Sequence, residues 1–305
     1  MTVAVAFGLA SALSVVVLGD ESGYLADQHQ AMKMASIEGM WHTEPAPASF
    51  NLIGFPNQAK HETVGTIKIP YVLGLIATRS ISQPVYGIDD LVRKAETNYI
   101  PKGLLAYQAL QVLQKNPNDL TARAAMRKNS HYLGYALLLK KYTDNPLTAT
   151  PAQLHKAAWD TVPKDIFILF WAFRIMVAVG FFLILLFGIG CYLSAKRKLL
   201  QSRWFLRIAL WSLPLPWVGA ECGWFVAESG RQPWVISGVL PTNLGVSSLA
   251  PHDVWISLIG FIFFYTVLAI VEFYLMIKYI RLGPDGISKQ GPYLSGGNKQ
   301  TASTT

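Results

Sequence analysis

Long apolar segments constrain this chain more than any other feature of its sequence. Three of them, residues 166–194, 204–226 and 254–280, are long enough to cross about 30 Å of hydrocarbon as helices. A fourth, residues 1–18, is shorter, because at about 1.5 Å per residue its apolar part reaches only roughly 26 Å. We interpret it as a spanning helix clipped at its start rather than a signal peptide, since no basic region precedes it. The sequence therefore predicts an all-α integral membrane protein with about four transmembrane helices.

Composition agrees with this class and excludes others. Charged residues make up 14% of the chain and hydrophobic residues 52%, whereas an ordinary globular domain has roughly 25% charged residues. The mean hydropathy of +0.32 is too low for a chain made only of spanning helices, so a large part must face water. The two cysteines, Cys191 and Cys222, could form at most one bridge. A disulfide framework and a cysteine metal cluster are therefore excluded.

The distribution of charge predicts the orientation in the membrane. The formal net charge is +8, and its clearest basic cluster lies in the short connection 195–203 and just after it. The positive-inside rule places this connection in the cytoplasm. Residues 19–165 and 227–253 then lie on the periplasmic side, and residues 281–305 form a cytoplasmic tail. Because polybasic segments beside a membrane need no nucleic acid as a partner, we expect no nucleic-acid binding.

The connection of residues 19–165 is far longer than the few residues usual between helices, which is typical of a functional or independently folded region. Its apolar spacing indicates a mostly helical periplasmic region. Helical spacing is clearest at residues 104–114 and 123–141, and turn signals lie at residues 45–47, 54–56 and 116–118.

Ionisable residues inside apolar segments are candidates for function, because they are costly in hydrocarbon. They are Arg174, Arg207, Glu221 and Glu272. On the third long segment Glu221, Trp224 and Glu228 recur at helical spacing, so they share one face that we do not expect to face lipid. Such a glutamate either bonds to neighbouring helices or serves as a carboxylate ligand to a metal or cofactor. A transporter built around Glu221 and Glu272 is a weaker alternative, because no inverted pair of broken helices is visible.

The second long segment carries Met176, with Gly180 one turn later. Methionine is usually an adaptable core residue, although its thioether can also be an axial haem ligand. Gly180 leaves that face of the helix without a side chain at its level, which would admit a flat macrocycle. Arg174 lies about 200° around the helix from Met176 and could meet a haem propionate only by reaching around an edge.

Several separated motifs follow one another along the chain. They are Gly19-Asp-Glu-Ser-Gly-Tyr24, Ala172-Phe-Arg-Ile-Met-Val177, Pro214-Leu-Pro-Trp217, Gly223-Trp-Phe-Val-Ala-Glu228, Gly230-Arg-Gln-Pro-Trp234 and Arg281-Leu-Gly-Pro284. Together these motifs resemble subunit I of the cytochrome bd-type ubiquinol oxidases. The similarity covers essentially the whole chain and corresponds to the C-terminal part of that subunit, with a long quinol loop.

The resemblance implies a part of the haem-containing subunit of a terminal respiratory oxidase. Such an enzyme oxidises ubiquinol at the periplasmic side and passes electrons through two haem b groups to haem d. Oxygen is reduced to water there, and a proton motive force is generated. The implied partners are oxidase subunit II and a small accessory subunit, in the bacterial inner membrane.

The same resemblance assigns roles to individual residues. Met176 matches the ligand of the low-spin haem b iron, and Arg174 matches a basic residue associated with that haem. Glu228 matches the ligand of the high-spin haem b iron, with Trp224 and Arg231 in the surroundings of that haem.

Two residues of the long connection, Lys33 and Glu38, match the pair implicated in quinol oxidation. Lys33 could hold the carboxylate of Glu38 ionised or bind a quinol oxygen. Without the resemblance, the two would be interpreted as a solvated pair on a surface helix.

The chain also departs from the family pattern. The family's subunit I has further helices before the first one seen here, and these carry histidine ligands of the low-spin haem b and of haem d. We expect none of the six histidines of this chain to lie within a spanning segment. The chain would therefore be inactive alone and would need the missing helices, whether it is a piece of a longer chain or one half of a split subunit. The alternative is a non-catalytic membrane protein that binds quinone or partner subunits.

Overall fold

The structure is a computed structural model that describes residues 2–290, with side chains described as far as residue 282. Its contacts divide the chain into two units, one that ends at Val246 and one that begins at Ser247. Each unit is described by itself.

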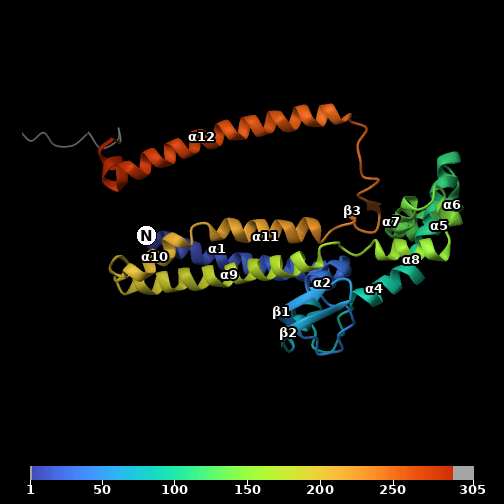
Figure 1. Cartoon of the computed structure of the whole chain (residues 1–305), viewed down its shortest axis with the longest axis horizontal. Coiled ribbons are helices and arrows are strands. Elements are labelled where there is room, and N and C mark those ends of the chain that lie inside the picture. The colour runs from blue at the N-terminus through green and yellow to red at the C-terminus, as the bar shows by residue number, and fades with distance from the viewer. Residues whose placement is uncertain (1, 291–305) are drawn as a thin grey trace, which may run out of the picture. The chain divides into compact units, whose positions relative to one another are not determined.

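Two long helices and a shorter one form the apolar part of the first unit. They are α1 (Thr2–His29), α9 (Ile166–Ala195) and α11 (Leu215–Ser229), and α9 packs against both of the others (Figure 1). Helix α9 agrees within one residue with the predicted segment 166–194. It holds no proline, and it ends where the basic connection begins.

Helix α1 is longer than predicted. It continues past Asp20 and Glu21 to His29, whereas the sequence pattern ended the segment at residue 18. Charged side chains end an apolar run without breaking a helix, because the backbone hydrogen bonds continue through them. The hydropathy pattern therefore marked the end of the apolar surface and not the end of the helix.

The third predicted segment, 204–226, is not one continuous helix. It consists of α10 (Arg203–Trp211) and α11, which are separated by residues 212–214. Pro214 and Pro216 explain the break, because proline has no N–H to donate and its ring clashes with the preceding turn. Among the described residues, three helices are long and apolar enough to span a membrane: Thr2–His29, Ile166–Ala195 and Pro251–Leu282.

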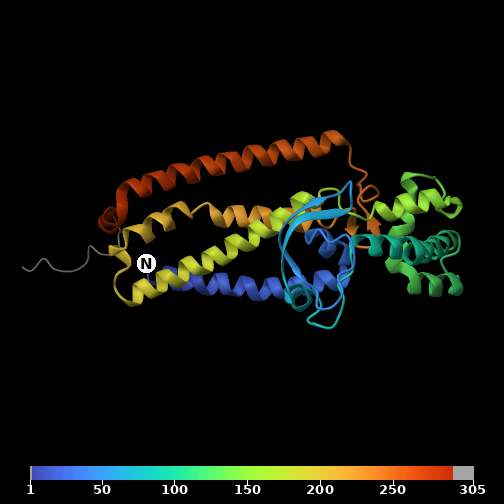
Figure 2. The ribbon, with the colours of Figure 1, turned by 60° about the horizontal axis from the view of Figure 1, so that its bottom comes forward.

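The region between α1 and α9 is mostly helical, as predicted, but it also holds a β-hairpin that the sequence pattern missed. Strands β1 (Phe50–Asn57) and β2 (Glu62–Ile69) pair antiparallel (Figure 2). The predicted turn at residues 54–56 is wrong, since these residues lie inside β1. The register shifts twice between Asn51 and Phe55, and these irregularities hide the alternation by which a strand is recognised.

A second small sheet joins β3 (Trp234–Ile236) to β4 (Leu240–Pro241). The expectation of an all-α chain is therefore corrected by two short two-stranded sheets. The remaining helices of the first unit are α2 (Ala31–Ile37), α3 (Val72–Ala77), α4 (Ile88–Lys94), a π-helical turn (Ala95–Tyr99), α5 (Ile100–Lys115), α6 (Leu120–Asn129), α7 (Leu133–Leu138) and α8 (Pro151–Trp159), with short 3₁₀ turns at Ser130–Tyr132, Leu139–Lys141, Pro146–Thr148 and Leu199–Gln201.

The predicted helical segments of this region are confirmed with one change. Residues 104–114 lie within α5, and the predicted turn at residues 116–118 separates α5 from α6. Residues 123–141, which were predicted as one helix, are divided among α6, α7 and two 3₁₀ turns. The carboxylate of Asp119 begins α6 by accepting a hydrogen bond from the Ala122 N–H at 2.9 Å.

The main core of this region gathers apolar side chains from α2, α4, α5, α7, α8 and the start of α9. Its fully buried members include Ile88, Ile100, Leu138 and Ile166, and the indole of Trp234 packs into the same cluster. This core fixes α2 and β3 relative to the first turn of α9. The side chains discussed below depend on that arrangement.

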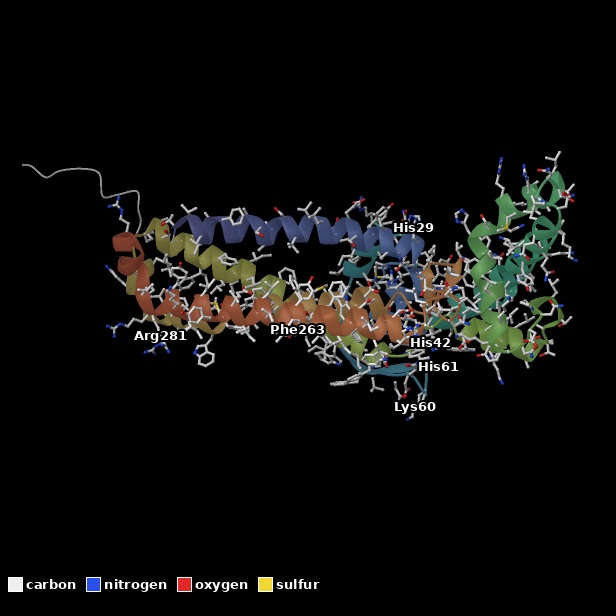
Figure 3. All side chains as sticks on the ribbon, turned by 90° about the horizontal axis from the view of Figure 1, so that it is seen from above. His29, His42, Lys60, His61, Phe263 and Arg281 are labelled. Atoms are coloured by element: carbon white, nitrogen blue, oxygen red, sulfur yellow. The ribbon has the colours of Figure 1, made fainter. Side chains whose placement is uncertain are left out.

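The second unit contains one long helix, α12 (Pro251–Gln290), in which Phe263 and Arg281 are labelled in Figure 3. The helix continues through residues 281–290, which were predicted to begin a cytoplasmic tail. Residues 291–305 of that predicted tail lie outside the described part of the chain.

Candidate functional site

The side chain of Arg174 joins α9 to two segments of the extramembrane region. It is 7% exposed although it is charged. Its Nη1 donates to the carbonyl oxygens of Ile37 and Phe170, both at 2.9 Å, and its Nε donates to the Asn51 carbonyl at 2.8 Å. Its Nη2 donates to Oε2 of Glu38 at 3.0 Å. Every nitrogen of the guanidinium is thus engaged with protein.

Glu38 is the buried counterpart of Arg174, with only 1% of its surface exposed. Burial raises the pKa of Glu38 to about 7, and the nearby charge of Arg174 together with the backbone N–H of Asn51 limits that rise. A carboxyl with this pKa exchanges its proton readily near neutral pH. The alternative of a solvated surface pair is therefore wrong for Glu38.

The local sequence explains why Glu38 turns inward. Helix α2 ends at Ile37, and Gly39 follows with a φ of +57°, a conformation that glycine adopts without strain. The Gly39 N–H donates to the Ser36 carbonyl and the Met40 N–H donates to the Ala35 carbonyl, which is the pattern of a Schellman helix end. A Cβ at Gly39 would lie 3.2 Å from the ring of Phe170, so the chain reverses directly against α9.

Lys33 lies on the same short helix but in other surroundings. Five residues of helix place its side chain roughly 140° around the axis from that of Glu38. Its Nζ donates to the carbonyl of Ala227 near the end of α11, at 3.4 Å. Burial lowers the pKa of Lys33, and the charge of Arg231 lowers it further while that of Glu228 opposes the change. The predicted partnership of Lys33 with Glu38 is not found, because Arg174 holds the carboxylate instead.

Glu228 and Arg231 form an ion pair at the end of α11, close to Lys33. Both side chains are partly exposed, and the Nε of Arg231 is buried without an acceptor among the described residues. The structure thus brings Lys33, Glu228 and Arg231 together at one corner, which we call the cationic corner. Trp224, one turn earlier on the same helix as Glu228, is 64% exposed.

A cavity of about 610 Å³ opens beside the cationic corner, with Lys33 and Arg231 in its wall. Three tyrosines, Tyr99, Tyr132 and Tyr135, line it together with Trp234. The three tyrosines were not predicted from the sequence, because they come from three separate elements. Only the i, i+3 spacing of Tyr132 and Tyr135 would have indicated a shared helical face.

Met176 occupies the face of α9 that packs against α11. A Cβ at Gly223 would lie 3.0 Å from its sulfur, so one side of the thioether is covered by α11. Gly180, one turn further along α9, faces open space, with nothing described within 4 Å of a Cβ built there. A half-buried thioether beside an open glycine fits an axial haem ligand. The side chain of Glu228, 43% exposed, also remains accessible to a further ligand.

The other ionisable candidates are exposed within their own units. Glu221 and Trp224 share an open face of α11, and Arg207 and Glu272 are exposed on α10 and α12. His29 is the last residue of α1 and His252 is the second residue of α12, so both lie at the ends of helices that are long and apolar enough to span a membrane. That no histidine lies within a spanning segment stays a prediction. Among the side chains described, those of residues 2–282, no group of three or more His, Cys, Asp or Glu is arranged to hold a metal ion.

The sequence matches characterised proteins over nearly its whole length. A family model described as "Cytochrome bd terminal oxidase subunit I" matches residues 1–284. "Cytochrome bd-II ubiquinol oxidase subunit 1" of Escherichia coli (strain K12) is 38% identical over 286 residues, which cover 94% of this chain and 55% of that protein. "Cytochrome bd ubiquinol oxidase subunit 1" of Bacillus subtilis (strain 168) is 26% identical over 284 residues, or 91% of this chain and 47% of that protein.

A further Bacillus subtilis (strain 168) relative, "Putative cytochrome bd menaquinol oxidase subunit I", is 35% identical over 116 residues, which cover 37% of this chain and 25% of that protein. The chain spans about half the length of the first two relatives. The family model and the Escherichia coli relative together cover nearly every segment described above. The chain belongs to the cytochrome bd terminal oxidase subunit I family.

Proposed function

We propose that this chain is the quinol-oxidising part of the haem-bearing subunit of a terminal respiratory oxidase. The observation that carries the proposal is the buried ion pair of Glu38 with Arg174, which joins the extramembrane region to α9 two residues before Met176. Buried carboxylates are costly unless they are paired, and a pair that is also poised to exchange a proton points to function.

Oxidation of a quinol releases two electrons and two protons, so a proton acceptor must lie beside the electron acceptor. The carboxylate of Glu38 can accept one of these protons, because its pKa of about 7 allows both uptake and release near neutral pH. Arg174 holds the ionised carboxylate in place before the proton arrives. After protonation the two side chains still share a hydrogen bond, but the attraction between opposite charges is lost.

The residues that would hold the haem groups lie on the helices that pack together. Met176 of α9 would supply its sulfur to the low-spin haem b iron, and Glu228 of α11 would supply its carboxylate to the high-spin haem b iron. Trp224 and Arg231 would surround the second group. The iron of a bound haem supplies one-electron redox chemistry. The resemblance also implies haem d, for which no ligand on this chain is proposed.

Arg174 acts in this proposal as a positioning residue and not as a direct haem contact. All of its nitrogens already bond to protein acceptors, among them the Glu38 carboxylate. Arg174 and Met176 lie two residues apart on α9 and about 200° around the helix from one another, so the charge of a haem held by Met176 would act on the Glu38 proton through space. Loss of an electron from that haem and loss of the proton would then favour one another.

The orientation and the partners follow from the charge pattern and the family. The basic connection between α9 and α10 would face the cytoplasm, which places the region of Glu38 on the periplasmic side of the inner membrane. Subunit II, a small accessory subunit and lipid would cover the exposed faces of the helices. Ubiquinol is the proposed substrate, since the relatives named as ubiquinol oxidases match most of this chain.

Two variants of the assembled oxidase test the proposal by opposite patterns. Glu38→Gln should reduce quinol oxidation by about a hundredfold or more while the haem absorption spectrum is kept, because only the proton acceptor is lost. Met176→Leu should remove the low-spin haem spectrum while the chain still inserts in the membrane. The control is Asp144→Asn, which replaces an exposed carboxylate that lines neither cavity. Full activity of Glu38→Gln would contradict the proposal and favour a non-catalytic quinone-binding or subunit-binding protein.

A further inference from the structure

A second cavity, of about 430 Å³, lies beside Glu38 and is separate in its lining from the larger one. Gly39, the residue after Glu38, forms part of its wall, as do Asn51 and Thr63 of the hairpin. His42 and His61 line it as well. The cavity therefore extends from Gly39 and Asn51, which adjoin the buried carboxyl of Glu38, to the imidazole rings of the two histidines.

Asn51 connects Glu38 to this cavity. Its Nδ2 donates to the carbonyl of Glu38 at 3.0 Å, and its backbone N–H faces the Glu38 carboxylate. Its Oδ1 is buried and accepts no hydrogen bond from any described residue. A buried acceptor without a partner costs about 1–3 kcal/mol, and a cavity of this size has room for the water that would satisfy it.

The two histidines of the cavity lie next to the same carboxylate, that of Asp89. The Nδ1 atoms of His42 and His61 lie 3.2 Å from the two different oxygens of Asp89. The ring of His61 stacks on Trp41 at a centroid distance of 4.9 Å and also contacts Trp159 at 4.6 Å. The side chain of His42 is 80% exposed. Figure 3 shows the two labelled histidines near one another. Because both line the cavity and His42 is mostly exposed, the cluster reaches from the cavity to solvent.

We propose that this cavity is the route by which the proton accepted by Glu38 leaves for the periplasm, through water at Asn51 and the cluster of His42, Asp89 and His61. The inference rests on the function proposed above. The carboxyl O–H of Glu38 gives its proton to water, and the water passes a proton to an imidazole nitrogen. That nitrogen releases it to solvent, and Glu38 returns to the carboxylate that faces Arg174. No electrons move in these steps.

The charges around the cavity favour this direction. Arg174, from α9, stabilises the Glu38 carboxylate that remains after the proton has left. At the cavity itself, Glu44 is paired with Lys68 at 2.9 Å and Glu62 with Lys60 at 3.8 Å. The carboxylate of Asp89 is left to face the two histidines, so a proton that arrives there is attracted.

The larger cavity is a poorer exit for a proton. Its wall contains three cations, Lys33, Lys128 and Arg231, which would repel an arriving proton. Asn51, which bonds to Glu38 and lines the smaller cavity, does not line the larger one. The two cavities therefore differ in the charge of their walls, and the smaller one is the better exit for a proton.

The test uses the assembled oxidase with the double variant His42→Gln and His61→Asn. Asparagine is chosen because residue 61 has a positive φ of 50°, which asparagine tolerates. We expect the rate of external proton release after a single turnover to fall about tenfold in weakly buffered medium. The infrared band of the protonated Glu38 carboxyl should persist correspondingly longer. External imidazole should restore the rate, since it can carry the proton in place of the missing side chains.

The matched control is His155→Gln. His155 also lies beside a carboxylate, that of Glu96 at 3.0 Å, and also contacts Trp159, but it does not line the cavity. Its proton release should be unchanged. Where the double variant fails to assemble, His42→Gln alone applies, because its side chain is mostly exposed, and a fall of about threefold is expected.

Normal proton release in the variants, or a slow release that imidazole does not restore, would overturn the inference. The outcome is separable from that of the proposed function. An inactive Glu38→Gln variant together with unaffected histidine variants would reject only the exit route. An active Glu38→Gln variant would reject the proposed function itself.

Discussion

Helix α2 carries two charged sites that differ in almost every respect. At its end, Glu38 is 1% exposed and forms a pair of opposite charges with Arg174. Earlier on the same helix, Lys33 belongs to a cationic corner with Arg231 and Glu228, where the pairing is incomplete and the side chains are partly open. A buried pair of opposite charges, with no net charge, can hold and release a proton. An open corner with excess positive charge is instead suited to attract an anion or a polar oxygen.

The largest effect should come from breaking the buried pair at Arg174. Arg174→Gln leaves the Glu38 carboxylate buried without its partner and removes hydrogen bonds to four carbonyl groups. We expect a loss of about 3–5 kcal/mol in the free energy of unfolding, because an uncompensated buried charge is costly. Thermal unfolding of the assembled oxidase measures it. Arg174→Lys, which keeps the charge, is the control and should lose less; an unchanged melting temperature for Arg174→Gln would contradict the buried pair.

A second effect concerns pH and belongs to Glu38 alone. Because its folded-state pKa of about 7 lies above the ordinary value of 4.5, the folded state binds a proton more tightly than the unfolded state does. Its contribution to stability is fully present below pH 4.5 and is lost as pH rises through about 7. We expect the wild-type chain to lose a few kcal/mol across this interval and Glu38→Gln to lose less. Equal pH profiles of thermal unfolding would show that the carboxyl is not buried.

The smallest effect should come from the cationic corner. Lys33→Gln removes one cation and a single long hydrogen bond, so the free energy of unfolding should change by about 1 kcal/mol or less. If Lys33 binds a quinol oxygen, KM for quinol should rise severalfold while the haem spectrum is kept. Lys128→Gln, at another cation of the larger cavity wall, is the matched control. A stability loss as large as that of Arg174→Gln would mean that the two sites do not differ as described.

Features that depend on local sequence were predicted well. The bounds of α9 follow from an uninterrupted apolar run, and the turn before α6 follows from its proline and asparagines. The break before α11 could also have been predicted, since Pro214 and Pro216 are visible in the sequence. The hairpin could not, because bulges in β1 interrupt its alternation and Gly54 with Pro56 imitates a turn.

The structure brings together residues that were chosen from the sequence, in pairs that were not expected, and the roles of these residues stay predictions. Glu38, Lys33, Arg174, Glu228 and Arg231 were all chosen from the sequence, and two of the contacts among them, Glu38 with Arg174 and Lys33 with the end of α11, were not expected. The histidine cluster was absent from the sequence-based site, since His42, His61 and Asp89 come from a loop, a hairpin turn and a helix. No spacing along the chain brings such residues together.

The sequence by itself determined that this chain is a helical membrane protein of the cytochrome bd subunit I family, because apolar length and motif order are properties of neighbouring residues. Only the tertiary structure decided that the Glu38 carboxylate bonds to Arg174, 136 residues away, and not to Lys33, five residues earlier. The physical reason is that the end of α2 and strand β1 pack onto α9 and exclude water there. In that buried site the only stable place for a carboxylate is against a guanidinium that the fold supplies from far along the chain.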